Sequence, residues 1–373
     1  MPILHTESSN GWGGQEIRIL KEAIGLRSRG HEIIFAVVTG GKLADRARKA
    51  GFTVYEIEFR KSSAFSALRN LLRIIKKHQI SIVNTHSSLD SWLGGIAGKI
   101  ARCKVIRTRH LSTAVRGGLN AFLLYRCLAD FIVTTSSAII PKIAQLARMP
   151  VSRFQCVPTG VEPFTADPKK VQEFREKLGV KENDVLIGTV CVVRSWKGIQ
   201  DLIEAAKLLK GHSHLKWVVV GGGYIENFRH LVDETTPLIF TGHLDDPSAA
   251  LGALDIFTLL STAHEGISQA SLQAAYLKKP LITTTIGGLP EVCLEGVTGI
   301  LVPPSSPEKV AAAVLRLASD PALRQLYGNA ASQLVEEKYT LQHTLDQMEQ
   351  LFLRFYTEHN SKIGFWAGSK PRD

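Results

Sequence analysis

The sequence of 373 residues contains no run of about 18 consecutive apolar residues, so we expect no transmembrane helix. Residues 1–6 lack a basic segment followed by a long apolar one, and they therefore predict no signal peptide. Cysteine is scarce: its five residues are odd in number, widely spaced and include no C-x-x-C pair. This pattern argues against a disulfide framework or a zinc site, and it favours a reducing, cytoplasmic compartment.

The fingerprints of three other protein classes are also missing. The N-terminal glycine loop is not G-x-G-x-x-G, and no acid ends the second expected strand, which disfavours a dehydrogenase. Neither a helix-turn-helix pattern nor aromatics interleaved with basic residues stands out, so we expect no nucleic-acid partner although the pI is near 9.4. No D-x-D cluster marks a metal-bound diphosphate, and we expect neither a metal nor a cofactor.

The net charge of +11 is unevenly distributed. Residues 1–162 contain 24 Lys and Arg against 10 Asp and Glu, a net charge of +14, whereas the remainder contains 21 against 24, a net charge of −3. A basic half suggests an anionic partner, such as membrane lipid or a phosphorylated acceptor.

Two segments of the basic half combine cations with apolar residues. The first, Ser66–His78, either packs as an outer helix with a solvated basic face or docks on anionic lipid. The second is Arg107–Arg126, which supports the lipid interpretation. Around the first segment we expect an apolar stripe of Phe65, Leu68, Leu72 and Ile75, with Arg69, Arg73, Lys76 and Lys77 elsewhere on the helix.

Short apolar runs alternate with helical patterns, which predicts an α/β fold of two Rossmann-like, doubly wound parallel-sheet domains. A Pro- and Gly-rich turn at Pro158–Pro163 places the boundary, giving domains 1–162 and 163–339. An amphipathic segment, Thr340–Thr357, follows and leads to a polar tail. The expected strands are Pro2–His5, Glu32–Val38, Thr53–Ile57, Ile80–Thr85, Lys104–Thr108, Phe131–Thr135, Leu186–Val193, Lys216–Gly221, Leu238–Thr241, Ile256–Leu260 and Leu281–Thr284.

Three loops follow expected strands and have the composition of ligand-binding loops. Asn10–Glu16 is rich in glycine and precedes a helix, which suits close approach to an anion, although a plain tight turn explains it equally well. Val193–Gly198 places Arg194 and Lys197 where open α/β sheets bind ligands, and two such cations suit a diphosphate. The alternative is a solvated loop. Gly221–Gly223 alone indicates only a turn.

The stretch His264–Glu291 is the most informative. It places Glu265 directly before an expected helix start and Gln273 about two turns later. A helix start offers free backbone amides that suit a phosphorylated sugar. Each residue has a plainer interpretation, since an acid at a helix start complements the helix dipole and a glutamine is ordinary within a helix. The ordered series of motifs favours the functional interpretation of both.

Two histidines, His86 and His110, follow expected strands of the first domain. A lone histidine is more often structural or simply exposed. Their position at strand ends, where α/β sheets bind ligands, makes both candidates for a site, His110 more than His86.

The order of these motifs resembles the retaining, nucleotide-sugar-dependent glycosyltransferases of the GT-B fold, family 4. The resemblance covers nearly the whole chain, with the last helix, from about 340 to 373, expected to complete the first domain. It implies two domains facing a central cleft, the first binding the acceptor and the second the donor. It rests on Gly13–Glu16, Thr108–His110, Pro158–Glu162, Arg194 with Lys197–Gly198, Gly221–Gly223, Thr241–Leu244, Glu265–Gly266 and Gly287–Glu291.

The resemblance also implies a role for each matching residue. Arg194 and Lys197 would bind the donor diphosphate, and backbone amides of Gly266, Ile267 and Ser268 its phosphate or sugar. Glu265 would hold sugar hydroxyls. The remaining donor-binding residues would be Gly14, Gly222, His243, Leu244 and Gln273, with His110, and His86 beside it, on the acceptor side. Of all these, Glu265, His110, Arg194 and Lys197 are the expected catalytic residues.

Gln273 departs from the family pattern, E-x7-E, whose second acid binds the ribose hydroxyls. A glutamine still accepts a hydrogen bond through its carbonyl oxygen, but without the assistance of a charge. The substitution therefore predicts a member of the family with lowered donor affinity or a shifted donor preference.

The resemblance implies metal-independent transfer of a hexose-type sugar from a UDP- or GDP-sugar to a hydroxyl of a glycan or lipid-linked acceptor. Lipopolysaccharide or other cell-surface polysaccharide synthesis is the expected setting, in the cytoplasm or peripherally on the inner membrane. Two alternatives stay open: a non-hydrolysing sugar-nucleotide epimerase of the same fold, and a catalytically silent nucleotide-sugar-binding module.

Overall fold

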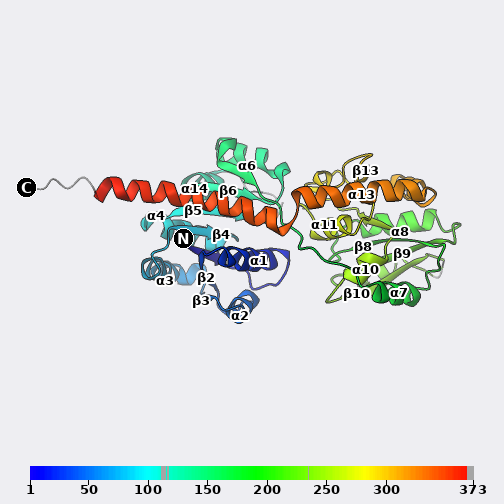
Figure 1. Cartoon of the computed structure of the whole chain (residues 1–373), viewed down its shortest axis with the longest axis horizontal. Helices are drawn as coiled ribbons and strands as arrows, with labels where there is room; N and C mark the ends of the chain where they lie inside the picture. The colour runs from blue at the N-terminus through cyan, green and yellow to red at the C-terminus, as the bar shows by residue number, and fades with distance from the viewer. Residues whose placement is uncertain (111–114, 116, 234, 368–373) are drawn as a thin grey trace, which may run out of the picture. The chain divides into compact units, whose positions relative to one another are not determined.

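The computed structural model describes residues 1–110, 115, 117–233 and 235–367. The chain forms two compact units (Figure 1). The N-terminal unit consists of Met1–Pro158 together with the chain from Leu341 onward, and the C-terminal unit is Thr159–Thr340. The units therefore divide after Pro158, where the sequence placed the boundary after residue 162. Within the described residues, no helix has the length and apolar character needed to cross a membrane.

The N-terminal unit is built on a parallel sheet in the order β3-β2-β1-β4-β5-β6-β7. The order reverses between β1 and β4, because β1 pairs with both β2 and β4. The carboxyl ends of these two strands form a switch point, where open α/β sheets bind ligands. The strands are β1 (Pro2–Glu7), β2 (Glu32–Val38), β3 (Thr53–Ile57), β4 (Ile82–Thr85), β5 (Lys104–Arg109), β6 (Phe131–Thr134) and β7 (Phe154–Cys156).

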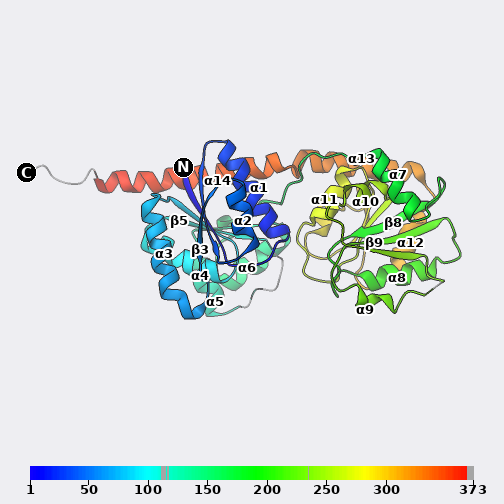
Figure 2. The same ribbon diagram turned by 90° about the horizontal axis from the view of Figure 1, so that it is seen from below.

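Helices cover both faces of this sheet (Figures 1 and 2). Successive strand residues point to opposite faces, so Ile3 packs with α1, α2 and α14, whereas Leu4 packs with α3 and α4. The helices are α1 (Gly14–Ser28), α2 (Lys42–Lys49), α3 (Ala64–Lys77), α4 (Leu89–Ile100), α5 (Leu119–Ala121), α6 (Ile140–Ala147) and α14 (Leu341–Ala367). The segment η2 (Phe122–Cys127) is π-helical, and short 3-10 turns are η1 (Lys61–Ser63), η3 (Ser137–Ile139) and η4 (Val151–Arg153).

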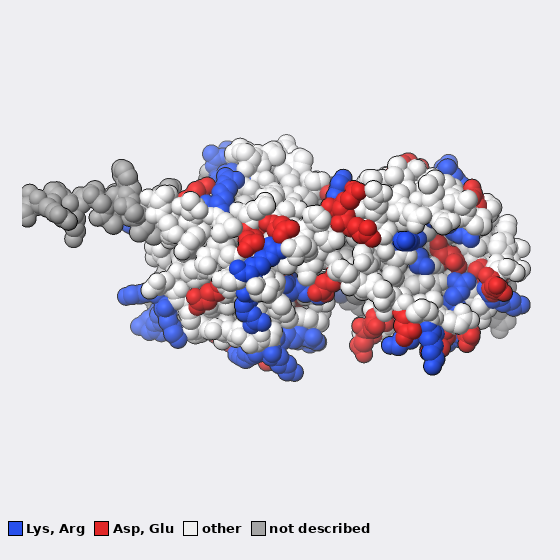
Figure 3. Space-filling model, in the orientation of Figure 1, with Lys and Arg blue, Asp and Glu red and all other residues white. Residues whose placement is uncertain are grey.

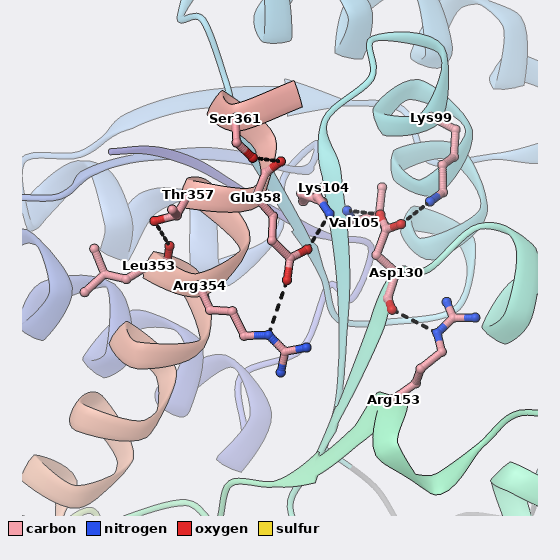
Figure 4. A network of polar contacts seen from close by, with 10 residues as sticks. All are labelled: Lys99, Lys104, Val105, Asp130, Arg153, Leu353, Arg354, Thr357, Glu358 and Ser361. Atoms are coloured by element: carbon pink, nitrogen blue, oxygen red, sulfur yellow. Dashed lines mark hydrogen bonds and ion pairs between the residues drawn. The ribbon is translucent and has the colours of Figure 1, made fainter. Parts of the chain in front are cut away.

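The helix α14 is part of the N-terminal core although the whole C-terminal unit, Thr159–Thr340, separates it in the chain from the rest of that core. Met348 and Phe352 on α14 are fully buried beside the sheet. Around this core, Lys104 at the start of β5 donates to Glu358 at 2.8 Å, and Arg354 reaches the other oxygen of the same carboxylate (Figure 4). Partly exposed pairs of this kind contribute little, so apolar burial is what holds the helix.

The C-terminal unit repeats the architecture with a parallel sheet in the order β10-β9-β8-β11-β12-β13. Here the order reverses between β8 and β11, which are paired neighbours. One core lies under α8 and α12 and the other under α10, α11 and α13 (Figure 2). The strands are β8 (Val185–Val190), β9 (Leu215–Val220), β10 (Leu238–Gly242), β11 (Ile256–Leu259), β12 (Leu281–Thr284) and β13 (Gly299–Val302). The helices are α7 (Pro168–Lys177), α8 (Ile199–Leu208), α9 (Glu226–Arg229), α10 (Ser248–Ala253), α11 (Gln269–Tyr276), η5 (Leu289–Glu291), α12 (Pro307–Ala318) and α13 (Pro321–Lys338).

The α/β fold of two Rossmann-like units is confirmed, but the expected stripe on α3 is only partly correct, because Ile75 is buried and Leu68 and Leu72 pack half-buried against the core, whereas Phe65 does not. The buried residues of α3 are Ala67, Leu71, Ile74 and Ile75, and Phe65 is 82% exposed. The buried face is therefore centred on Ala67, Leu71 and Ile74, and Phe65 lies in solvent together with the basic residues. Arg107–Arg126 is likewise no single amphipathic segment, because Arg107 lies within β5, and residues 111–114 and 116 lie outside the described part.

Candidate functional site

The switch point of the C-terminal unit carries a buried ion pair. The loop after β8 supplies Lys197, and the loop after β11 supplies Glu265, whose side chain is 7% exposed. Lys197 Nζ donates to Glu265 Oε1, and Ser261 Oγ donates to the same oxygen at 2.7 Å. No hydrogen bond to Glu265 Oε2 is recorded among the described residues. The structure thus joins two residues for which the sequence predicted separate ligand groups.

Glycines let the backbones of these loops approach closely. Gly198, with φ at 65°, lies so near Leu260 that an added Cβ would stand 1.9 Å from the Leu260 carbonyl oxygen. Gly287, with φ at 59°, lies equally close to the Glu265 carbonyl oxygen. Any side chain at either position would push the loops apart and move Lys197 or Glu265.

The start of α11 offers unpaired backbone donors beside the ion pair. The helix begins at Gln269, later than expected, with Ser268 as its N-cap. Among the described residues, no partner is recorded for the backbone N–H groups of Gly266, Ile267 and Ser268. Such groups at a helix N-terminus attract anions. Gln273 lies half-buried on this helix, and no hydrogen bond of its side chain is recorded.

The other donor-side candidates line the same edge of the sheet. The Arg194 guanidinium lies 5.1 Å from the ring centre of Tyr224, a residue that the sequence did not single out. No carboxylate among the described residues lies within ion-pair distance of Arg194. Gly222 lies against the Cβ of His243 and accepts a hydrogen bond from the Val193 N–H at 2.7 Å.

His243 and Leu244 follow β10 and differ in exposure. The side chain of His243 is largely exposed and lies 3.3 Å from Asp245. Leu244 is half-buried and packs against the core of the unit. Of these two residues, His243 is therefore the one that presents its side chain largely to solvent.

In the N-terminal unit, the glycine loop leads into α1 as predicted. Gly14 is the first helical residue, and an added Cβ there would meet no atom within 4 Å. The space beside Gly14 is therefore open to a ligand. The next residue, Gln15, donates to Glu7 Oε2 at 2.5 Å and to Ser87 Oγ at 2.9 Å.

The two predicted histidines belong to a hydrogen-bonded chain of three. His5 Nδ1 lies 2.9 Å from His86 Nε2, and His86 Nδ1 lies 2.9 Å from His110 Nε2. Burial lowers the pKa of His5 to about 3, and it lowers the pKa of His86 and His110 well below the usual 6.5. All three rings are therefore neutral near pH 7. A neutral ring has one N–H, so the three rings donate in one common direction.

Two acids lie beside this chain. Burial, and next the charge of Asp90, raise the pKa of Glu7 to about 7, although hydrogen bonds from Ser87, Ser9 and Gln15 oppose the shift. Burial also raises the pKa of Asp90, whose carboxylate accepts hydrogen bonds from Thr6 Oγ1, Ser8 Oγ and the His86 N–H.

A pocket of about 480 Å³ opens at the carboxyl ends of β4 and β5. His86 and His110 line it together with Arg107 and Arg109 of β5, and Tyr125 of η2 forms part of its wall. Arg109 donates to Tyr125 Oη at 2.8 Å, and the Arg107 guanidinium lies 4.5 Å from the Tyr125 ring centre. A π-helical turn is rare and occurs most often at functional sites.

The candidate site residues thus fall into two groups, one in each unit. Glu265, Lys197, Arg194 and the start of α11 gather in the C-terminal unit, and Gly14, His86 and His110 in the N-terminal unit. Arg107, which also lines the pocket, was missed. Its signal was present, because an arginine in the middle of a strand is rarely buried without a partner of opposite charge. The described residues contain no group of three His, Cys, Asp or Glu side chains that could hold a metal ion.

Comparison with known families matches both halves of the chain. Residues 12–163 match the model described as Glycosyltransferase Family 4, and residues 170–334 match Glycosyl transferases group 1. The capsular polysaccharide biosynthesis glycosyltransferase CapM of Staphylococcus aureus is 27% identical over 326 residues, which are 80% of this chain and 84% of CapM.

Two solved structures share the fold. Anabaena HepE, solved in complex with UDP, superposes with a TM-score of 0.84 at 19% identity, over 95% of this chain and 100% of HepE. A glycosyltransferase from Rickettsia africae superposes with a TM-score of 0.85 at 23% identity, over 96% of this chain and 98% of that one.

The lowered pKa of His5 predicts how acid affects the N-terminal unit. Between pH 6.5 and about 3 the unfolded state binds a proton at His5 that the native state does not. Stability from this residue is therefore complete above pH 6.5 and is lost as the pH falls, by about 1.4 kcal/mol per pH unit. Glu7, with its raised pKa, changes stability with pH in the opposite direction. Its contribution is the same in the wild type and in a variant of His5, so it cancels when the two are compared.

We expect His5→Asn to remove this dependence. Urea unfolding at about pH 5 and about pH 6 should show a gain in the free energy of unfolding with pH that is smaller in the variant by about 1.2 kcal/mol. His214→Asn, at an exposed position of the C-terminal unit, should behave as the wild type. An unchanged pH slope in His5→Asn would contradict the neutral histidine chain.

Proposed function

Because the chain belongs to the group 1 glycosyltransferases of the GT-B fold, with a family 4 N-terminal unit, we propose that it transfers a hexose-type sugar from a nucleoside-diphosphate sugar to a hydroxyl of a glycan or lipid-linked acceptor. The donor is a UDP- or GDP-sugar, and the anomeric configuration is retained. The observation that carries the proposal is the switch point of the C-terminal unit, where Lys197, Glu265 and the unpaired amides before α11 converge.

The donor diphosphate fits the cations and amides of this edge. As the bond to the sugar breaks, negative charge grows on the leaving diphosphate, and groups already aimed at it stabilise the transition state. Arg194 offers a planar fork without a competing carboxylate, and the N–H groups of Gly266–Ser268 add donors at the helix end. These groups perform the charge neutralisation that a metal performs in other transferases, so we propose metal-independent transfer.

Glu265 suits the sugar of the donor. Its Oε1 is held by Lys197 and Ser261, which fixes the carboxylate, while Oε2 retains accepting capacity for a sugar hydroxyl. Lys197 also lies within reach of the phosphate region next to Glu265, so one cation serves both the carboxylate and the diphosphate. Gly14 and Gly222 provide close backbone approach, and His243 and Leu244 contact the base.

Retention needs a proton acceptor on the face that the leaving group vacates. We propose that a leaving phosphate oxygen accepts the proton of the acceptor hydroxyl. His110 is neutral and tied to His86 at 2.9 Å, which supports a role in positioning hydroxyls rather than in abstracting the proton. His86 holds the His110 ring in place.

The setting of the reaction is proposed to be the synthesis of lipopolysaccharide or another cell-surface polysaccharide, on the cytoplasmic face of the inner membrane. The likeness to CapM, a capsular polysaccharide enzyme, supports this setting. The exposed face of α3 supports docking on the membrane, because it combines Phe65 with four cations and α3 contains no acid. Lys and Arg side chains gather over α3 and α2 in Figure 3.

Incubation with labelled UDP- and GDP-sugars and a mixture of glycan and lipid-linked acceptors tests the reaction. Transfer of the label supports the proposal. An epimerised donor would indicate the sugar-nucleotide epimerase instead, and a bound but unchanged donor would indicate a silent binding module.

Arg194→Ala should weaken donor binding on the order of ten- to a hundredfold, because it removes a charge-assisted hydrogen bond to the diphosphate. Calorimetric titration with UDP and GDP measures the loss. Arg194 is the cleaner test than Lys197, whose removal leaves the buried Glu265 carboxylate without its counter-ion. Arg229→Ala, on exposed α9, is the matched control and should bind as the wild type. Equal affinities in both variants would refute the diphosphate role.

Gln273→Glu should keep or raise donor affinity, because a carboxylate accepts the ribose hydroxyls with the assistance of its charge. The same titration measures it, with exposed Gln145→Glu on α6 as the control for added charge. A large loss of affinity confined to Gln273→Glu would remove the ribose assignment.

Liposome flotation tests the membrane face. The protein should float with vesicles of about 30% anionic lipid and not with neutral vesicles, since each cation contributes about 1 kcal/mol at such a surface. Flotation should be lost when the α3 cations are changed to Gln: Arg69, Arg73, Lys76 and Lys77. The control changes four exposed lysines of the C-terminal unit to Gln: Lys169, Lys170, Lys177 and Lys181. Equal flotation of the two variants would contradict docking through α3.

A further inference from the structure

The pocket of the N-terminal unit is strongly positive. Arg107 and Arg109 both line it, and none of its recorded lining residues is an acid. The two lining histidines are neutral, so they neither add to this charge nor balance it. The excess charge inside the pocket is therefore that of the two guanidinium groups.

Arg107 is the more unusual of the two, because it is 5% exposed and has no hydrogen-bond partner among the described residues. Its Nε and Nη1 atoms are buried and unpaired. The Arg107 guanidinium makes a cation–π contact with the ring of Tyr125, whose centre is 4.5 Å away. An aromatic face stabilises a buried positive charge much less than a carboxylate does. A buried cation without a counter-ion is costly, so a residue of this kind indicates an absent anionic ligand.

The nearest acid does not fill this role. Asp90 influences Arg107 electrostatically but lies beyond ion-pair distance, and its oxygens already accept from Thr6, Ser8 and the His86 N–H. Glu7 is occupied by Ser9, Gln15 and Ser87. Both acids thus have hydrogen-bond donors of their own and do not depend on Arg107.

We propose that Arg107 and Arg109 form a subsite for an oxyanion, a phosphate or carboxylate carried by the sugar acceptor. The guanidinium fork matches either group in a bidentate arrangement. His110 lines the same pocket and supplies a neutral ring for hydroxyls beside the charged group. The acceptor is therefore an acidic or phosphorylated glycan rather than a neutral one. This inference rests on the proposed transferase function, which it deepens.

Three related sugars test the subsite by calorimetric titration: glucose, glucose 6-phosphate and glucuronate. At least one anionic sugar should bind about tenfold or more tightly than glucose, and added salt should weaken that preference. The better of the two identifies the group as phosphate or carboxylate. Arg107→Gln should reduce the affinity for that anionic sugar to the affinity for glucose. Arg126→Gln, at an exposed arginine of η2 outside the pocket, should leave the preference for the anionic sugar intact.

Variant stability separates a binding role from a structural one. If Arg107 serves a ligand, ligand-free Arg107→Met should unfold at or above the wild-type temperature, because an unpaired buried charge has been removed. Arg109→Gln, at a less buried position, provides a second loss-of-binding variant. Equal binding of the three sugars, or an anionic preference that survives in both Arg107→Gln and Arg109→Gln, would overturn the proposal.

Nucleotide binding distinguishes the failure of this subsite from failure of the proposed function. Arg107→Gln should bind UDP or GDP as the wild type does, and Arg194→Ala should retain the preference for the anionic sugar. If the wild-type protein bound neither UDP nor GDP, the proposed transferase function would be contradicted. The sugar titrations would still decide whether the oxyanion subsite exists.

Discussion

Where the strand order of a parallel sheet reverses, the two adjacent crossovers leave on opposite faces, and the carboxyl ends of the central strands remain uncovered. Both units of this protein have such a point, β1 beside β4 and β8 beside β11. Of the candidate site residues, His86, Arg194, Lys197 and Glu265 lie in the loops after these four strands, and Gly14 begins the helix after β1. The position of Lys197 against Glu265 thus follows from sheet topology, and Gly198 and Gly287 make the contact close enough for an ion pair.

The two units treat buried charge differently. In the C-terminal unit a cation and a carboxylate pair with each other, which holds the Glu265 carboxylate in a fixed orientation while it is out of water. In the N-terminal unit Arg107 stands unpaired beside a neutral histidine chain. A self-compensated pair is stable without ligand and lets one oxygen remain available, whereas an uncompensated cation is stabilised chiefly by what binds to it. The first arrangement suits a site for a common donor, and the second suits selection among acceptors.

Most strand positions were well predicted because each of these strands is a short apolar run between turn residues, but β7 and β13 were not expected. Thr53–Ile57 and Glu32–Val38 match the expected bounds. The buried face of α3 was misplaced at Phe65, which fits a helical stripe by sequence as well as the residues that are buried. The pairing of Lys197 with Glu265 has no local signal, because it joins loops 68 residues apart. Ser268 as the cap explains why α11 begins beyond Glu265.

The place of α14 in the N-terminal core has a consequence for synthesis on the ribosome. Met348 and Phe352 fill the space beside β1 and α1, so this unit stays incomplete until nearly the whole chain has emerged. The C-terminal unit is a continuous stretch and has all its parts earlier. Domains generally fold as units from the N-terminus onward during translation. Here the first unit to be synthesised is the last to be completed, and its apolar face needs protection in the interval.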